Sequence, residues 1–185
     1  MDKIKRTLLY GGLDKETFNK HKDCITENDI RHLTIYLLIA GTGFGLLWMA
    51  SLVTNGFAHT NALVYLVTSV LFFIQFICLK ISIKKCGINN PVNTAYVYTF
   101  ATILYFESIY LTTLHPSMPA VTYIGILLMI PLLFAQVPFV TIICQTIFVI
   151  IFCICVSIFK YPEIAYIDIW NSFTFLIVSV LTMSL

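Results

Sequence analysis

The sequence predicts an all-α integral membrane protein: a six-helix transmembrane bundle with a short cytoplasmic N-terminal helical head. Hydrophobic residues make up 59% of the 185 residues and charged residues 11%, against about 45–50% and about 25% in typical soluble domains. Residues 1–32 hold 7 of the 11 basic and 6 of the 9 acidic side chains. This composition excludes a water-soluble core and divides the chain into a polar head at 1–32 and a transmembrane domain at 33–185.

The head is expected to contain a short helix of its own. Asp14 is a suitable N-cap for a helix that ends near Cys24. Thr26 begins an approximate capping box, so a second helix is expected to start near Glu27 and to enter the bilayer at Leu33. This segment is either a solvated juxtamembrane helix or a surface that binds anionic headgroups.

Six apolar runs follow the head. A spanning helix needs about 20 mostly apolar residues, and short connectors with turn-forming residues separate runs of about this length. The predicted spans are 33–53, 61–81, 93–114, 118–134, 138–159 and 168–185. Because every connector is short, no extramembrane domain is expected between the spans.

The basic residues predict the orientation. If the N-terminus is cytoplasmic, ten of the 11 basic residues lie on the cytoplasmic side, and Lys160 alone lies on the outer side. Six spans then return the C-terminus to the cytoplasm. The last run ends without a basic or polar anchor, so we expect the chain to continue into a cytoplasmic domain.

Several residues are expected to serve helix packing. Gly41 and Gly45 form a small-xxx-small pair, which lets another helix approach closely. Gln75 and Gln145 fall at the same predicted depth, where their amides can meet. Pro131 deletes a backbone donor and is expected to kink the fourth span, and Pro138 opens the fifth.

Glu107 is the one charge predicted within the membrane. An ionised carboxylate there costs several kcal/mol unless it is partnered or solvated. Helical spacing places Tyr96, Thr99 and Tyr110 near the same stripe of the third span, and His115 follows in the next connector. These five residues are the candidate ligand-binding residues. Three interpretations of Glu107 remain: a structural interhelical bond, an extracytoplasmic ligand site, and a proton or ion path.

Catalytic chemistry has little support in the sequence. There is no nucleophile elbow, zinc-binding HExxH or phosphate-binding glycine loop, and the six cysteines form no CxxC pair. We therefore expect no catalytic residue, no metal site and no cofactor in this chain. A net charge of +2 indicates no nucleic-acid surface. The expected partners are the lipid bilayer, a second copy of the chain in a homodimer and, at the candidate site, a small-molecule ligand.

Several short segments resemble a known family. They are Tyr10-Gly-Gly-Leu-Asp-Lys-Glu-Thr-Phe18, Ile25-Thr-Glu-Asn-Asp-Ile-Arg-His-Leu33, Ile130-Pro-Leu-Leu-Phe134 with Pro138, and Lys160 followed by Asp168-Ile-Trp-Asn171. Together they resemble the six-helix membrane modules that precede GGDEF domains in many clostridia-like bacteria. The chain departs from the family at Ala135-Gln136-Val137, where an acidic-basic pair often stands.

The resemblance implies a function for the longer protein. A C-terminal GGDEF domain would be a diguanylate cyclase, which condenses two GTP into cyclic di-GMP with magnesium, and none of its catalytic residues lies in this chain. The chain would then be a sensor in a bacterial cell membrane, with both termini cytoplasmic, that relays an extracytoplasmic or membrane cue to this output. The alternatives are a small multi-span transporter or permease component and a purely structural anchor.

Overall fold

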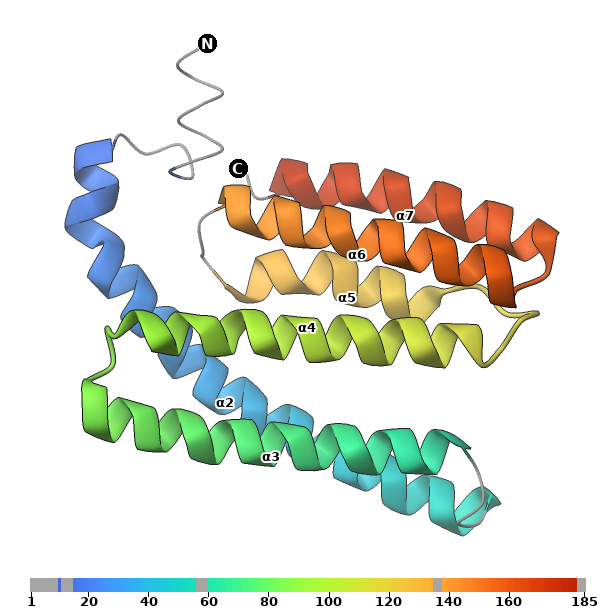
Figure 1. Cartoon of the computed structure of the whole chain (residues 1–185), viewed down its shortest axis with the longest axis horizontal. Coiled ribbons are helices and arrows are strands. Elements are labelled where there is room, and N and C mark those ends of the chain that lie inside the picture. The colour runs from blue at the N-terminus through green and yellow to red at the C-terminus, as the bar shows by residue number, and fades with distance from the viewer. Residues whose placement is uncertain (1–9, 11–14, 56–59, 135–137, 183–185) are drawn as a thin grey trace. The chain divides into compact units, whose positions relative to one another are not determined.

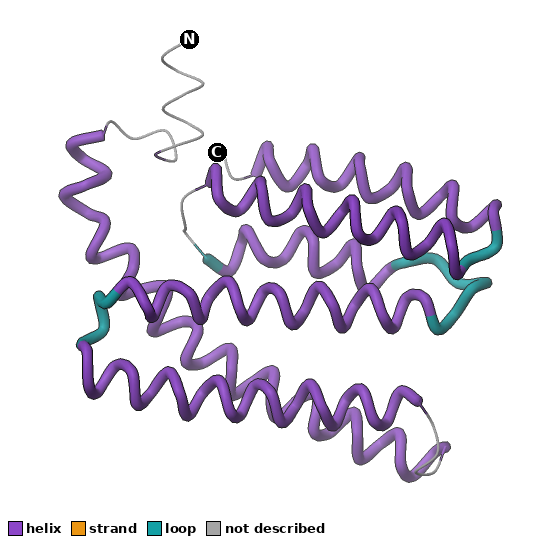
Figure 2. Tube along the Cα trace, viewed as in Figure 1, coloured by secondary structure: helices purple, strands orange, loops and turns teal. Residues whose placement is uncertain are grey.

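The computed structural model describes residue 10 and residues 15–55, 60–134 and 138–182. Within these residues the protein is all-helical, with no strand (Figures 1 and 2). The all-α class is therefore confirmed. The helices are α2 (Lys15–Asn55), α3 (Thr60–Cys86), α4 (Pro91–Thr113), α5 (Val121–Leu133), α6 (Pro138–Phe159) and α7 (Pro162–Thr182).

Four of these helices are long and apolar enough to cross a membrane. The qualifying segments are Lys15–Thr54, Asn61–Cys86, Phe139–Phe159 and Pro162–Thr182. By contrast, α5 has 13 residues and extends about 20 Å, whereas the hydrocarbon core is about 30 Å thick. A membrane protein is therefore supported, and the six-span bundle with its cytoplasmic head stays a prediction.

The helical break predicted in the head is wrong, because α2 runs without interruption from Lys15 to Asn55. Extending an existing helix adds a hydrogen bond per residue, whereas starting a second one requires a new, costly nucleus. No glycine or proline stands between Lys15 and Gly41 to force a stop. An i,i+4 ion pair between Arg31 and Glu27, 2.7 Å long, lies on the helix where the break was expected. The predicted N-cap, Asp14, lies outside the described residues.

The chain divides into two compact units. One comprises Thr26–Ile103, here called the α3 unit, and the other comprises Met1–Ile25 with Leu104–Leu185, here called the α7 unit.

In the α3 unit, α2 and α3 approach closely at small residues. The Ser69 hydroxyl of α3 donates a 2.7 Å hydrogen bond to the Gly41 carbonyl of α2. A Cβ on Gly41 would lie 3.3 Å from the Phe73 ring, and one on Gly45 would lie 3.3 Å from Ser69 Oγ. The predicted packing role of this glycine pair is confirmed.

The turn between α3 and α4 is held by part-buried hydrogen bonds. Gly87 ends α3 with a φ of 81°, a conformation that glycine adopts without strain. The Asn93 amide nitrogen of α4 donates to the carbonyls of Gly87 and Ile88, at 2.8 and 3.0 Å. Its Oδ1 accepts a 2.6 Å bond from the Ser82 hydroxyl of α3. Asn90 caps α4 by accepting a bond from a backbone N–H two residues later.

In the α7 unit, α7 packs against both α5 and α6, and the end of α4 joins them through stacked aromatic rings. Tyr105 of α4 stacks on Phe148 of α6 at a centroid distance of 4.6 Å. One turn further along α6, Phe152 stacks on Tyr123 of α5 at 3.9 Å. Both pairs are buried, so they form the apolar centre of this unit.

Two helices in the α7 unit, α6 and α7, each begin at a proline. The α6 bounds, Pro138–Phe159, agree with the predicted span at 138–159. The last helix begins at Pro162, six residues before the predicted start at 168. Proline suits the first position of a helix, and Glu163 in the first turn favours the positive end of the helix dipole.

Candidate functional site

Glu107 lies in α4 and is 6% exposed. Its Oε1 atom is buried and has no hydrogen-bond partner within the described part of the chain. The neighbouring Ser108 hydroxyl bonds back to the Tyr105 carbonyl of its own helix rather than to this carboxylate. A buried polar atom without a partner is costly. The structural-bond, ligand-site and ion-path interpretations of Glu107 all stay predictions.

Two of the predicted companions of Glu107 on α4 face outward. Tyr110 is 42% exposed, and Thr99 is exposed with its hydroxyl bonded to the Ala95 carbonyl of the same helix. At 3.6 residues per turn these two positions lie about 60–80° around the helix from Glu107. Thr99 and Tyr110 therefore lie at the edge of a stripe of α4 that has Glu107 at its centre. Their binding role stays a prediction.

The other two candidate residues, Tyr96 and His115, lie in different parts of the chain. Tyr96 is half-buried, and its backbone carbonyl accepts a 2.6 Å hydrogen bond from the Gln75 amide of α3. His115 is exposed in the connector between α4 and α5, where its backbone N–H donates to the Thr112 carbonyl at 3.4 Å.

The two glutamines lie in different units, so their predicted meeting stays a prediction. Gln75 Nε2 donates to the Tyr96 carbonyl, and its Oε1 is buried without a partner among the described residues. Gln145 uses both ends of its amide, donating to the Leu127 carbonyl of α5 and accepting from the Ser179 hydroxyl of α7, each at 2.9 Å.

A buried ion pair that the sequence interpretation missed lies at the turn between α6 and α7. Lys160 Nζ is 2.5 Å from Asp168 Oδ2, and both side chains are 0% exposed. The ammonium also donates to the Met118 carbonyl at 2.5 Å. The second carboxylate oxygen accepts a 2.9 Å bond from the Ala120 backbone N–H. The pair thus fastens α6 and α7 to the connector between α4 and α5.

One sequence signal could have revealed this pair. Placing the helix start at Pro162, with Glu163 in its first turn, puts Asp168 almost two turns inside the last helix. An acidic residue inside an apolar helix requires a partner. Lys160, eight residues earlier across a tight turn, is the one basic residue after residue 85.

The same face of α7 carries two further buried polar contacts. Ser172 Oγ lies 3.8 Å from Cys153 Sγ of α6, a weak hydrogen-bonding contact. Ser179 bonds to Gln145 of α6, as described above. The three α7 residues, Asp168, Ser172 and Ser179, are all 0% exposed, and their spacing of four and seven residues places them on one helix face. We call these three residues and their partners, Lys160, Cys153 and Gln145, the polar column.

Two tyrosine hydroxyls lie close to the polar column. The hydroxyls of Tyr105 and Tyr123 are buried without a hydrogen-bond partner among the residues the structure describes. The Tyr105 hydroxyl is near the Gln145 amide, but the two groups do not reach hydrogen-bonding geometry. The Tyr123 hydroxyl is near Cys153.

In the described ranges no group of three histidine, cysteine or acidic side chains comes together in a way that would hold a metal ion. Comparison with protein-family models, curated proteins and solved structures finds no match to this chain.

Proposed function

We propose that this chain is a membrane-embedded signal-input module. In this proposal six spans place both termini in the cytoplasm of a bacterial cell, and the bundle senses an extracytoplasmic or membrane cue. The last helix, α7, relays the cue to a C-terminal cytoplasmic output domain, for which the family resemblance suggests a GGDEF diguanylate cyclase.

The polar column is the observation that carries this proposal. Asp168 and Ser179 are 11 residues apart, so the buried contacts of α7 cover about 16 Å of its length. Buried hydrogen bonds and ion pairs are directional, so α7 has few positions in which all of them form. A displacement at one end of α7 is therefore passed along the helix as a rigid shift, which is a common form of signal transfer.

The connector between α4 and α5 supplies the input end. It contributes the Met118 carbonyl and the Ala120 N–H to the ion pair, and it carries the exposed candidate His115. Glu107 and Tyr110 lie within the last two turns of the preceding helix, α4. A ligand that binds these candidate residues and moves the connector would therefore pull directly on Lys160 and Asp168.

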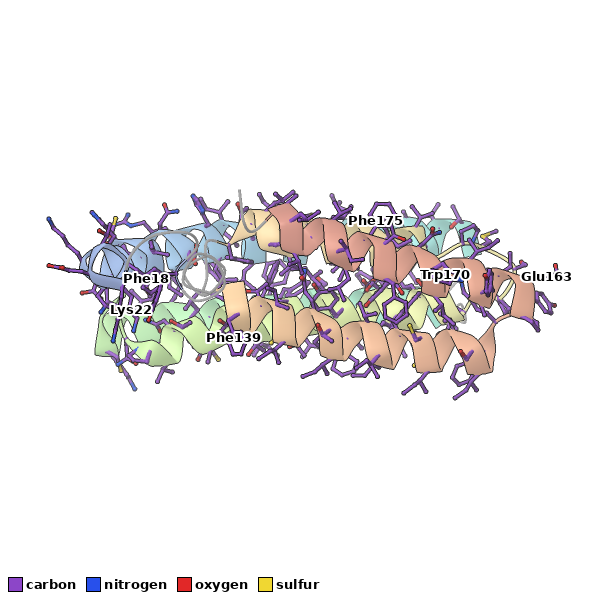
Figure 3. All side chains as sticks on the ribbon, turned by 90° about the horizontal axis from the view of Figure 1, so that it is seen from above. Phe18, Lys22, Phe139, Glu163, Trp170 and Phe175 are labelled. Atoms are coloured by element: carbon purple, nitrogen blue, oxygen red, sulfur yellow. The ribbon has the colours of Figure 1, made fainter. Side chains whose placement is uncertain are left out.

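Exposed aromatic side chains support the membrane placement of this end. Tyr161, Tyr166 and Trp170 are exposed around the turn between α6 and α7. Trp170 lies two turns along α7 from Glu163 (Figure 3), and its ring packs edge-on against Tyr166 at 6.2 Å. Tryptophan and tyrosine are enriched at membrane interfaces because their rings are amphipathic.

Glu107 favours a second candidate function, a small transporter. Its Oε1 is buried without a partner in the part of the chain that the structure describes, and a buried carboxylate in a membrane-spanning bundle is typical of ion and proton pathways. A proton flux into liposomes that contain the purified chain, abolished by Glu107→Gln, would support transport. The signal-input proposal predicts no flux above that of empty liposomes.

Replacement of the bundle tests the proposed function. The gene that encodes this chain is expressed in bacteria, and cellular cyclic di-GMP is measured for the natural protein and for a variant in which an unrelated hairpin of two membrane spans, which keeps the C-terminus in the cytoplasm, replaces residues 33–185. We expect cyclic di-GMP above the empty-vector level, and an altered level in the replacement at equal protein amount. Equal output from both proteins would identify a structural anchor, and no output from either would contradict the cyclase.

A further inference from the structure

Three lysines gather at the C-terminal end of α3. Lys80, Lys84 and Lys85 lie within six residues and are all exposed. None of them takes part in an ion pair within the described residues. The sequence contains no acidic residue between Asp29 and Glu107, and α3 itself carries none. This surface, which we call the lysine cluster, is therefore an uncompensated positive patch.

The dipole of α3 stabilises only part of the positive charge of the lysine cluster. Cations near a helix C-terminus interact well with the helix dipole, and Lys84 and Lys85 lie in the last turn of α3. However, Lys80 and Lys84 are four residues apart on one face, where like charges repel. An anion bound between them would remove this repulsion.

An exposed apolar stripe leads directly into the lysine cluster. Ile74, Ile77 and Ile81 of α3 are each about half exposed. The ammonium of Lys80 lies 5.6 Å from the Phe76 ring centroid, beside this apolar surface. One continuous surface of α3 therefore offers several turns of apolar contact and ends in three ammonium groups.

The turn that follows the lysine cluster is preorganised. The bonds of Asn93 to Ser82 and to the backbone of residues 87 and 88 fix the end of α3 against the start of α4. The lysines are therefore presented from a fixed backbone, which lowers the entropy that binding must overcome.

We propose that this surface of α3 binds a phospholipid with an anionic headgroup. The acyl chains lie along the isoleucine stripe, and the lysine cluster binds the headgroup phosphate. Charge complementarity and the apolar approach both fit this one occupant, whereas a soluble anion uses only the lysines. The inference rests on the membrane placement proposed above, and it concerns lipid binding rather than nucleotide output.

Lipid retention by the purified chain tests the proposal. The chain is reconstituted in nanodiscs of phosphatidylcholine with a minority of phosphatidylglycerol, extracted in mild detergent, and the retained lipids are counted by native mass spectrometry. We expect phosphatidylglycerol to be retained preferentially. Each Lys→Gln substitution in the lysine cluster should weaken its binding about fivefold, and the triple variant about a hundredfold.

The matched control removes three exposed lysines from α2, namely Lys15, Lys20 and Lys22, of which Lys22 is labelled in Figure 3. This triple variant has the same net charge as the lysine-cluster variant and should retain phosphatidylglycerol like the natural chain. A triple Lys→Arg variant of the lysine cluster keeps the charge and separates misfolding from lost recognition. Equal losses in the two Gln triples, or unchanged retention in both, would overturn the proposal. Displacement of the lipid by millimolar inorganic phosphate would also overturn it, because it would identify a soluble anion as the ligand.

Discussion

Lys160 and Asp168 hold opposite charges in a place from which water is excluded. Each charge is costly to bury alone, and their 2.5 Å contact with two added backbone hydrogen bonds offsets that cost. The stabilisation therefore belongs to the pair and not to either residue. Single and double substitutions at these two positions are therefore expected to change the free energy of unfolding differently.

The ion pair makes a prediction about stability. Lys160→Met or Asp168→Leu alone should lower the free energy of unfolding by about 3–5 kcal/mol, because each leaves a buried charge or its backbone partners uncompensated. The double variant should recover most of this loss, since two apolar side chains can replace a buried pair. Reversible unfolding in detergent measures all three variants. Additive losses in the double variant would show that the two side chains do not act as a pair.

Substitution by leucine is expected to change the stability of the bundle differently at Glu107 and at Gln145. Glu107→Leu removes a buried oxygen that has no partner among the described residues, so it should cost less than about 0.6 kcal/mol or stabilise the bundle. Gln145→Leu breaks two buried interhelical bonds and should cost about 0.6–1.7 kcal/mol. The same unfolding measurement compares them. A larger loss for Glu107→Leu than for Gln145→Leu would indicate that the carboxylate makes a structural bond.

At the scale of the helix, close approach depends on which glycine faces a neighbour. A Cβ on Gly41 meets the Phe73 ring at 3.3 Å, whereas a Cβ on Gly43 meets nothing within 4 Å. Both glycines lie inside α2, so the change in helix propensity is the same for each. The two positions therefore form a matched pair for testing the contact between α2 and α3.

The same substitution, glycine to leucine, is expected to lower stability at Gly41 but not at Gly43. Gly41→Leu should destabilise the α3 unit by about 1–3 kcal/mol through overpacking against α3. Gly43→Leu should be neutral or slightly stabilising, because leucine favours helix and finds open space. Thermal unfolding in detergent distinguishes them. Equal midpoints for the two variants would contradict the packing described for α2 and α3.

The sequence predicts which segments form helices more reliably than it predicts where those helices begin and end. Pro138 marks the start of α6, and its predicted span agrees with the helix. The start of α7 was missed because Pro162 was read as part of a loop rather than as the first residue of a helix. The break in α2 was predicted from a capping pattern at Thr26, but a local cap does not end a helix that already runs through it.

The sequence predicts the arrangement of side chains only where one helix determines it. The stripe on α4 containing Glu107 follows from helical spacing alone, and the structure shows that Glu107 is buried. The pairing of Lys160 with Asp168 and of Gln145 with Ser179 requires knowing which faces of α6 and α7 meet. Apolar residues surround these helices on every side, so the hydrophobic pattern does not specify those faces.

At the scale of the whole molecule, the proposed relay requires that the C-terminal end of α7 faces the cytoplasm. Both termini are expected in the cytoplasm because ten of the 11 basic residues then lie inside. A fluorescent protein fused after Leu185 should be bright, and alkaline phosphatase inserted after Ser117 should be active. The reverse pattern would place the ion pair on the cytoplasmic side and remove the proposed direction of relay.

The most direct test of the relay is the output of the natural protein when the polar column is broken at its input end. Cyclic di-GMP is measured in cells expressing the natural gene, the Lys160→Met variant, and Lys20→Gln as an exposed-lysine control outside the lysine cluster, at equal protein amounts in the membrane. The relay predicts a several-fold change in cyclic di-GMP for Lys160→Met and natural output for Lys20→Gln. Natural output from Lys160→Met, in a protein whose unfolding shows that the ion pair is lost, would contradict signal transfer through α7.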